Sequence, residues 1–252
     1  MENMNIGLIG YGHMGKAFEK RFKEVQEKGA LIDWHLQVSS SHDNTVLARN
    51  SDIVVLTVKP GHVEEALANI RGNVKKGAGL LSLAGVVPVR FLQQGFDGVV
   101  GRGMADLGFE QAIRHQGDER INFLMDALSE DTCLETGDET VVDQHTTLVA
   151  CNPGISAWHF LHNAEVAAAW LREHTQLTED ILGVNPAAME RLQRKVFEEG
   201  NFAGRIKEVA TVGGVTESMV LALEAARGNI ACEPLYQVGM RKIEAVLQKF
   251  SA

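Results

Sequence analysis

The sequence predicts an α/β fold, in which a Rossmann-type dinucleotide-binding domain with a parallel sheet is followed by an all-α domain. A glycine-rich turn at residues 10–15 joins a short apolar run to a helical pattern near the N-terminus. Further short apolar runs alternate with helical segments up to about residue 145, which is typical of right-handed βαβ units. From about Thr147 the pattern is helical throughout. We therefore place the two domains at residues 1–145 and 146–252.

Composition and charge exclude several classes of partner. The chain has 24 Lys and Arg against 33 Asp and Glu, a net charge of −9, which argues against binding to duplex nucleic acid. No apolar run approaches the roughly 18 residues of a transmembrane helix. Cys133, Cys151 and Cys232 form no CxxC pair, which favours free thiols over a disulfide framework or a zinc site. We expect a cytoplasmic protein with no membrane partner, no nucleic-acid partner and no metal.

The first predicted strand and helix flank the glycine turn. Residues 5–9 are apolar and suit a buried strand, and residues 16–26 show helical spacing. Between them, Gly10 permits a tight turn, Gly12 leaves room for a pyrophosphate, and Gly15 lets the helix pack close to the strand. The helix N-terminus would supply N–H donors to the phosphates. A purely structural glycine turn is the alternative.

The second predicted strand, residues 34–38, indicates which dinucleotide is bound. NAD sites usually carry an acidic residue at the end of this strand, which binds the ribose hydroxyls. Here three serines and His42 follow the strand and could donate hydrogen bonds to a 2′-phosphate, which favours NADP. Asp43 argues against this interpretation, and an ordinary polar loop is the alternative. Between residues 43 and 51 there is room for little more than one helical turn.

Three more strands complete the predicted parallel sheet, at residues 52–58, 79–83 and 98–101. Ligands of such sheets bind beyond the carboxyl ends of the strands. This rule places four segments along one edge of a crevice: residues 10–15, 39–42, 58–60 and 82–85.

The second half predicts helices with apolar faces. One long helix is expected over residues 155–172, and its face with Trp158 and Trp170 must pack in a core or against another subunit. Asn185, followed by a proline, should cap the start of another helix, and Gly200 should end it.

A Gly213-Gly214 pair precedes a further predicted helix. Backbone N–H groups at the positive end of that helix would suit a carboxylate. A plain helix–helix turn with Thr216 as the cap is equally compatible with the residues.

Two other groups of residues carry little chemistry. His159, His162 and Glu165 lie at a spacing that could bind metal, but no further ligand is evident, and a solvated or interface stripe is the better interpretation. Ser156 lacks the glycines of a nucleophile elbow, so acyl transfer has little support.

Taken together, these motifs resemble the pyrroline-5-carboxylate reductase family over nearly the whole chain. The resemblance rests on residues 9–14, 39–52, 58–60, 82–85 and, above all, 211–216. It implies a Rossmann domain followed by an all-α domain that dimerises by intertwining, giving a homodimer or a higher homo-oligomer. It also implies NADPH-dependent reduction of a cyclic imine, with 1-pyrroline-5-carboxylate as substrate and L-proline as product.

The resemblance also assigns residues by position. Those implied to bind NADP are Gly10, Gly12, His13, Met14, Ser39, Ser40, Ser41, Asn44, Val58, Lys59, Pro60, Ala84 and Gly85. Those implied to hold the substrate are Met104, Thr211, Gly213, Gly214 and Thr216. The Thr216 hydroxyl is the candidate catalytic group, hydrogen-bonded to the imine nitrogen.

The chain departs from the family pattern mainly on the substrate side. The segment 102–108 keeps only Arg102 and Met104 of the usual residues, and Asp106 could repel a carboxylate substrate. The usual start of the dimer helix is replaced at residues 150–155, and Val212 stands where the family has proline. A helix–strand unit after Asp43 is missing.

Two rival functions remain open. One is an NADP-dependent dehydrogenase or imine reductase of the 3-hydroxyacid-dehydrogenase type, but the predicted helix 155–172 lacks the lysine that such enzymes use. The other is a catalytically silent NADP-binding sensor, which the altered segments 104–108 and 151–155 favour.

Overall fold

The structure is a computed structural model that describes residues 3–39, 44–131 and 133–250. The chain divides into two compact units, Met1–Val142 and Asp143–Ala252. Each unit is described separately below.

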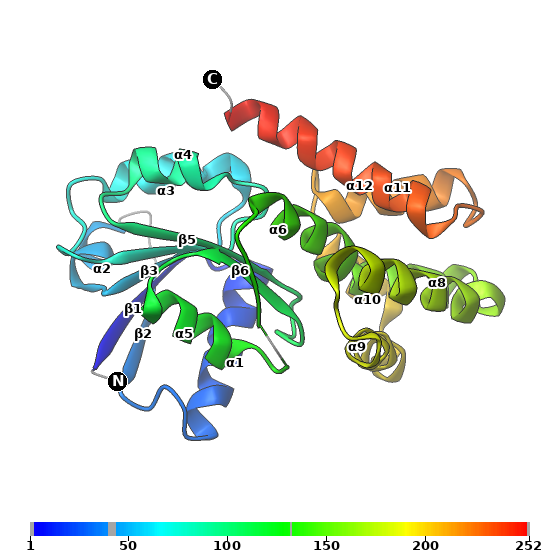
Figure 1. Cartoon of the computed structure of the whole chain (residues 1–252), viewed down its shortest axis with the longest axis horizontal. Helices are drawn as coiled ribbons and strands as arrows, with labels where there is room; N and C mark the ends of the chain where they lie inside the picture. The colour runs from blue at the N-terminus through cyan, green and yellow to red at the C-terminus, as the bar shows by residue number, and fades with distance from the viewer. Residues whose placement is uncertain (1–2, 40–43, 132, 251–252) are drawn as a thin grey trace. The chain divides into compact units, whose positions relative to one another are not determined.

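Within the described residues, the N-terminal unit contains one seven-stranded sheet in the order β2-β1-β3-β4-β5-β6-β7 (Figure 1). All neighbouring strands are parallel except β5 and β6, which form an antiparallel pair. The order of the first five strands is that of one common doubly wound fold, and it places β2 at the edge. The strands are β1 (Met4–Ile9), β2 (Trp34–Val38), β3 (Ile53–Leu56), β4 (Gly79–Ser82), β5 (Val99–Ala105), β6 (Ala112–Gln116) and β7 (Cys133–Thr136).

Helices cover both faces of this sheet. Figure 1 shows α1 and α5 on one face and α3 and α4 on the other. Buried side chains of α1 and α5, among them Phe18, Phe22 and Leu124, pack against Ile6 and Leu8 of β1 in one hydrophobic cluster. The helical segments are α1 (His13–Glu27), α2 (Thr45–Asn50), the 3₁₀ turn η1 (Pro60–His62), α3 (Val63–Ile70), α4 (Val89–Gly95), α5 (Glu119–Leu128) and α6 (Glu139–His145).

The predicted fold class is confirmed, and all five predicted strands are present. Their ends shift by at most two residues, except that β5 runs four residues further than predicted. The short connection expected before residue 51 is the six-residue helix α2. The last part of the sheet, β6, α5 and β7, was not predicted. β6 (Ala112–Gln116) is short and has few apolar residues, so its pattern is weak. A recognisable signal did precede α5, because the Asp118 carboxylate caps the N–H groups of Arg120 and Ile121.

The C-terminal unit is helical throughout its described residues. A π-helical turn, Thr146–Ala150, leads into its first long helix. The helices are α7 (Asn152–His162), α8 (Ala164–Leu182), α9 (Pro186–Glu199), α10 (Phe202–Val209), α11 (Val215–Ala225) and α12 (Cys232–Leu247), followed by the 3₁₀ turn η3 (Gln248–Phe250).

The prediction of one long helix over residues 155–172 is wrong, because the helix is interrupted at Asn163. This residue has non-helical dihedral angles, φ −149° and ψ 45°. Its N–H donates to the carbonyl of His159, which ends α7, and its carbonyl accepts from Ala167, which starts α8. Buried Trp158 and Trp170 lie on either side of the break, so the apolar periodicity runs through it. The predicted cap at Asn185 and stop at Gly200 are confirmed, since Asn185 Oδ1 accepts from Ala187 N–H and Gly200 is left-handed.

A buried polar array lies inside the C-terminal unit. Ser156 Oγ donates to Asn152 Oδ1 at 3.0 Å, and Asn152 Nδ2 lies 3.1 Å from His174 Nδ1. The Trp170 ring stacks between the rings of His174 and His159. In the stripe interpreted as solvated or as an interface, His159 is fully buried and not solvated, whereas His162 and Glu165 are exposed. Among the residues that the structure describes, no group of three or more His, Cys, Asp or Glu side chains is placed to hold a metal.

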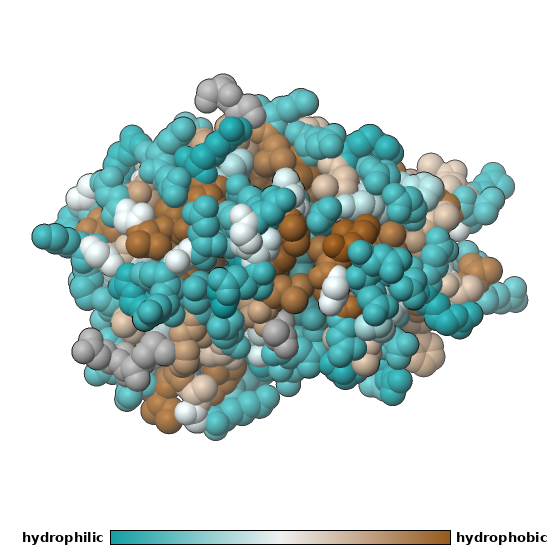
Figure 2. Space-filling model, viewed as in Figure 1, coloured by the Kyte–Doolittle hydropathy of each residue, from teal (hydrophilic) through white to brown (hydrophobic). Residues whose placement is uncertain are grey.

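The surface seen in Figure 2 is mostly hydrophilic, with apolar residues between the charged ones. In the described parts of the chain, no helix combines the length and apolar character needed to cross a membrane.

The buried histidines predict that the C-terminal unit loses stability in mild acid. Burial lowers the pKa of His145 to about 3 and the pKa of His174 to about 4, from an ordinary value of 6.5. Because the folded pKa values lie below those of the unfolded chain, protons bind first to the unfolded chain as the pH falls below about 6.5. Each histidine should therefore lower the free energy of unfolding by about 2 kcal/mol between pH 7 and pH 5.

Urea denaturation at about pH 7 and pH 5, followed by circular dichroism, measures this loss. The substitution His174→Gln should remove about half of the loss from these two residues, since one of the two histidines no longer titrates. The control is His62→Gln, because the His62 side chain is 66% exposed. A free energy of unfolding that is equal at both pH values would contradict the prediction.

Candidate functional site

The glycine turn between β1 and α1 is held by close backbone contacts. Gly10 has φ +99°, and a Cβ there would lie 2.7 Å from the backbone nitrogen of Val58. A Cβ on Gly15 would lie only 2.2 Å from the carbonyl oxygen of Gly10. Neither position has room for a side chain, so these two glycines let α1 approach the ends of β1 and β3.

Thr57, directly after β3, fixes this turn, although the sequence analysis did not single it out. Its hydroxyl donates to the Gly10 carbonyl at 2.6 Å, and its N–H donates to the Ile9 carbonyl at 2.9 Å. The sequence did offer one sign of this role, because Thr57 is a hydroxyl residue between a buried apolar strand and Lys59. Thr57 thus ties β3 to the glycine turn at the point where the strand order reverses.

The space beside Gly12 fits a phosphate group. No atom outside residues 11–13 lies within 4 Å of the position where a Gly12 Cβ would be. Gly12 is the N-cap of α1, no side chain caps this helix end, and no acidic residue lies in its first turn. His13 is exposed and Met14 half-buried against the core. The positive end of α1 therefore faces open space, as a pyrophosphate site requires.

The serine segment after β2 is described only at its two ends. Ser40 and Ser41 lie outside the described residues. Ser39 N–H donates to the Leu8 carbonyl, and Ser39 Oγ donates to Asn44 Oδ1 at 2.5 Å. This bond brings together two of the residues that the resemblance assigned to the cofactor.

The segments after β3 and β4 carry the remaining cofactor-side residues. Val58 is half-buried, Lys59 is exposed, and Pro60 begins the 3₁₀ turn η1. Ala84 is buried, and Gly85 is followed by Val86, a buried β-branched residue with φ +66°. Left-handed backbone at such a residue is strained, and strain of this kind concentrates at functional sites.

Met104 on β5 approaches Gly85. A Cβ on Gly85 would lie 3.4 Å from Met104 Cε, and the Met104 side chain is buried. The structure thus places this substrate-side candidate against a cofactor-side candidate at the ends of neighbouring strands, β4 and β5.

Asp106 holds a turn together. Its Oδ2 accepts from Gly108 N–H at 2.7 Å, and its Oδ1 accepts from Gln111 N–H at 2.9 Å. The residue is 2% exposed. This carboxylate is buried in the β5–β6 connection, where its oxygens accept backbone N–H groups, so it holds its own turn. Repulsion of a substrate carboxylate by Asp106 stays a prediction.

In the C-terminal unit, residues 211–214 form a tight turn before α11. Gly214 N–H donates to the Thr211 carbonyl at 2.8 Å, Gly213 has φ +75°, and Gly213 N–H donates to Glu217 Oε2 at 2.6 Å. The N-cap of α11 is Gly214, so the alternative of Thr216 as the cap is wrong.

Thr216 is buried in the first turn of α11. Its hydroxyl donates to Cys151 Sγ at 3.1 Å. Burial raises the pKa of the Cys151 thiol to about 12, so the sulfur is an uncharged acceptor. Gly154 on α7 allows this approach, because a Cβ there would lie 3.0 Å from Thr216 Cγ2. No local pattern in the sequence indicates this contact, since 65 positions separate Cys151 and Thr216.

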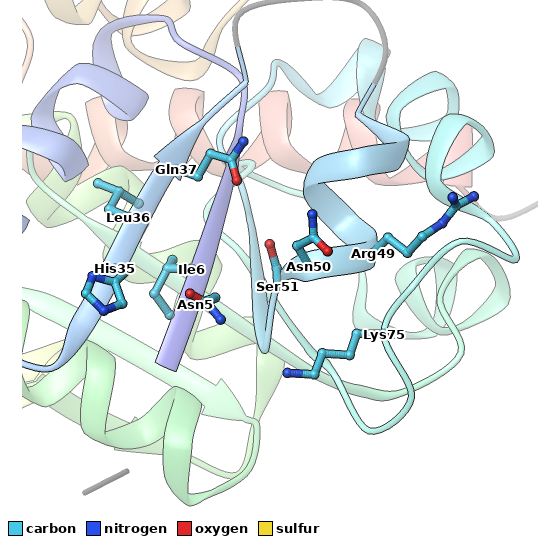
Figure 3. A pocket seen from close by; sticks show the side chains of 9 residues that line it. All are labelled: Asn5, Ile6, His35, Leu36, Gln37, Arg49, Asn50, Ser51 and Lys75. Carbon is cyan, nitrogen blue, oxygen red and sulfur yellow. The ribbon is translucent and has the colours of Figure 1, made fainter. Parts of the chain in front are cut away.

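A pocket of about 460 Å³ lies in the N-terminal unit, beside β2 and the end of α2 (Figure 3). It is away from the glycine turn, because the β1 residues that line it, Asn5 and Ile6, end about 13 Å of strand before Gly10. Lys75 at its rim is paired with Asp52, and Arg49 donates to Asn73. The pocket is lined by Asn5, Ile6, His35, Leu36, Gln37, Arg49, Asn50, Ser51 and Lys75.

Residues 5–85 match the family model described as NADP oxidoreductase, coenzyme F420-dependent. This segment runs from β1 past the end of β4 and includes the glycine turn, Ser39, Asn44, Lys59 and Gly85.

Three pyrroline-5-carboxylate reductases are similar in sequence. Pyrroline-5-carboxylate reductase 3 of Bacillus subtilis is 22% identical, and the alignment covers 97% of each chain. The enzyme of Methanosarcina acetivorans is 31% identical, but this alignment spans 35% of the chain and only 38% of the relative. The enzyme of Aquifex aeolicus is 34% identical over 33% of the chain and 35% of the relative.

Two solved structures share the fold. Plasmodium falciparum pyrroline carboxylate reductase, determined with NADP bound, is 18% identical, with 99% of this chain and 98% of that one covered and a TM-score of 0.56. The Streptococcus pyogenes 1-pyrroline-5-carboxylate reductase is 19% identical, with 97% and 98% covered and a TM-score of 0.52. The full-length alignment and the two partial alignments all agree with the family that the motifs resemble. The chain is thus similar to pyrroline-5-carboxylate reductases in sequence and in fold.

Proposed function

We propose that this protein is an NADPH-dependent reductase of a cyclic imine, with 1-pyrroline-5-carboxylate as substrate and L-proline as product. The observation that carries the proposal is the uncapped N-terminus of α1, which faces open space at Gly12. The names of the relatives support the choice of substrate, and the NADP bound to the Plasmodium falciparum enzyme supports the choice of cofactor.

The N-terminal unit would hold the cofactor. The pyrophosphate would lie against Gly12 and the first N–H groups of α1, at His13 and Met14. Ser39 and Asn44, together with Ser40 and Ser41, would bind the 2′-phosphate end. The segments 58–60 and 84–85 would lie toward the nicotinamide, as expected for the carboxyl ends of parallel strands.

The C-terminal unit would hold the imine through Thr211, Gly213, Gly214 and Thr216. NADPH, when bound, supplies the hydride. The Thr216 hydroxyl would donate to the imine nitrogen, and the proton would come ultimately from water. To do so, Thr216 must release Cys151 Sγ, which accepts from it in this structure. Positioning of the two reactants can lower the barrier by about 7–11 kcal/mol, so few reactive side chains are needed.

We also propose that the protein forms a homodimer or a higher homo-oligomer through its helical unit. Leu161, Val166, Phe197 and Leu221 on helices of this unit are large apolar side chains that are exposed in the single chain. Burial of such residues stabilises subunit association. Light scattering during gel filtration tests this proposal, and a monomer at every concentration would contradict it.

The function is tested by following loss of NADPH absorbance with 1-pyrroline-5-carboxylate as substrate. Turnover that depends on both reactants is the expected result. Tight NADPH binding without turnover would rule out the proline assignment, and a panel of other imines and oxoacids would then separate a different reductase from a silent sensor.

Two glycine variants should separate cofactor binding from folding. Gly12→Ala places a methyl group in open space, so the free energy of unfolding should change by less than about 1 kcal/mol. NADPH should bind at least about tenfold more weakly, because the methyl group takes the room of the pyrophosphate. Gly15→Ala should lower the free energy of unfolding by about 1–3 kcal/mol, because its Cβ would meet the Gly10 carbonyl.

Isothermal titration with NADPH and urea denaturation measure the two effects. Unchanged NADPH affinity in Gly12→Ala would contradict the placement of the pyrophosphate.

Replacement of Thr216 should slow turnover while NADPH affinity stays nearly intact. Thr216→Ala and Thr216→Val both remove the hydroxyl, and valine keeps a methyl group near Gly154. We expect both variants to lose at least about tenfold in kcat, because a positioned proton donor contributes about 10²–10⁴-fold. Thr216→Ser, which keeps the hydroxyl, is the matched control. Equal turnover in the wild type and Thr216→Val would remove Thr216 from the site.

A further inference from the structure

The turn assigned to the substrate already holds a carboxylate, and this carboxylate belongs to the chain itself. Glu217 Oε2 accepts the N–H of Gly213 at 2.6 Å. Glu217 is the third residue of α11 and lies in its acidic first turn, at the positive end of the helix. Its carboxylate therefore occupies the kind of position that the Gly213-Gly214 turn would offer to an anionic ligand.

The contact differs from an ordinary capping box. In that motif the carboxylate of the third helical residue accepts the N–H of the N-cap residue. Here the N-cap is Gly214, and its N–H donates instead to the Thr211 carbonyl. Glu217 reaches one residue further, to Gly213, which lies outside the helix. The Glu217 side chain therefore binds the turn before α11 and does not cap the helix itself.

Gly213 is also open to an incoming ligand. The residue is exposed, and no atom outside residues 212–214 lies within 4 Å of the position of a Cβ on Gly213. Val212 beside it is 84% exposed. A ligand carboxylate can thus approach the same N–H group, and only one of the two carboxylates can accept its hydrogen bond in good geometry.

We propose that Glu217 is an internal competitor for the substrate carboxylate and so determines the KM for imines that carry one. The proposal rests on the proposed function, which assigns this turn to the substrate. A substrate carboxylate must displace Glu217 from Gly213 N–H and meets its negative charge. An imine without a carboxylate does not need to displace Glu217 and is not repelled by its charge. Glu217 is a specificity-determining residue, because its bond is to the turn that positions the substrate.

Kinetics with two substrates test this role. For 1-pyrroline-5-carboxylate, Glu217→Ala should lower KM by about five- to tenfold, and Glu217→Gln, which keeps an oxygen acceptor without the charge, by less. The kcat should stay within about twofold in both variants, since Glu217 is assigned no contact with the C=N bond. For 1-pyrroline, which has no carboxylate, KM should also stay within about twofold.

The matched control is Glu224→Gln. Glu224 lies on the same helix and is exposed, so this variant changes the charge of α11 without touching Gly213. Its KM for 1-pyrroline-5-carboxylate should equal that of the wild type. A general effect of net charge would lower KM in both Glu217→Gln and Glu224→Gln, and would overturn the proposal.

A binding measurement keeps the test independent of turnover. L-proline and pyrrolidine, which differ by the carboxylate, are titrated into the NADP-loaded protein in a calorimeter. Glu217→Ala should bind L-proline about five- to tenfold more tightly than the wild type and pyrrolidine equally well. Thermal melting of the variant confirms that it is folded.

The possible outcomes separate the two proposals. Tighter binding of L-proline by Glu217→Ala, without turnover of either imine, would support the role of Glu217 and contradict the proposed function. Turnover of 1-pyrroline-5-carboxylate with the same KM in wild type and Glu217→Ala would overturn the role of Glu217 alone. Unchanged or weaker binding of L-proline in Glu217→Ala, or none in either protein, would also overturn it.

Discussion

The contact of the Gly10 carbonyl with Gly15 and Thr57 is the constraint on which the N-terminal unit depends. The carbonyl oxygen lies where a Gly15 side chain would be, and it accepts the Thr57 hydroxyl. This single group therefore joins the end of β1, the first turn of α1 and the residue after β3. The open N-terminus of α1 is fixed by the same contact, so the packing of the sheet and the position of a phosphate site have one cause.

The first five strands were predictable from the sequence because their signals are local. Buried parallel strands are continuous apolar runs, and the glycine turn has a fixed spacing. The break at Asn163 was not predictable in this way, since the buried tryptophans on both sides belong to the same apolar pattern. The β6–α5–β7 segment was missed because β6 has too few apolar residues to stand out.

In the candidate site too, the residues of a local motif were predictable and those that depend on distant contacts were not. The roles of Gly10, Gly12 and Gly15 follow from backbone geometry, which a short motif determines. The bonds of Thr216 to Cys151 and of Asp106 to its own turn depend on contacts that no motif describes. Asp106 shows the difference, because the sequence indicates its charge but not the backbone N–H groups that its carboxylate accepts.

The π-helical turn Thr146–Ala150 gives the C-terminal unit a spare residue. A π turn holds one residue more than an α turn, so the loss of one residue there restores regular α-helix and leaves the following helix facing the same way. Loss of one residue within α7 would instead rotate the rest of the helix by about 100°. The turn is followed directly by Cys151, and then by Asn152 and Gly154 in the first turn of α7. We therefore expect the loss of one residue to be tolerated in the turn before Cys151 but not in α7 after it.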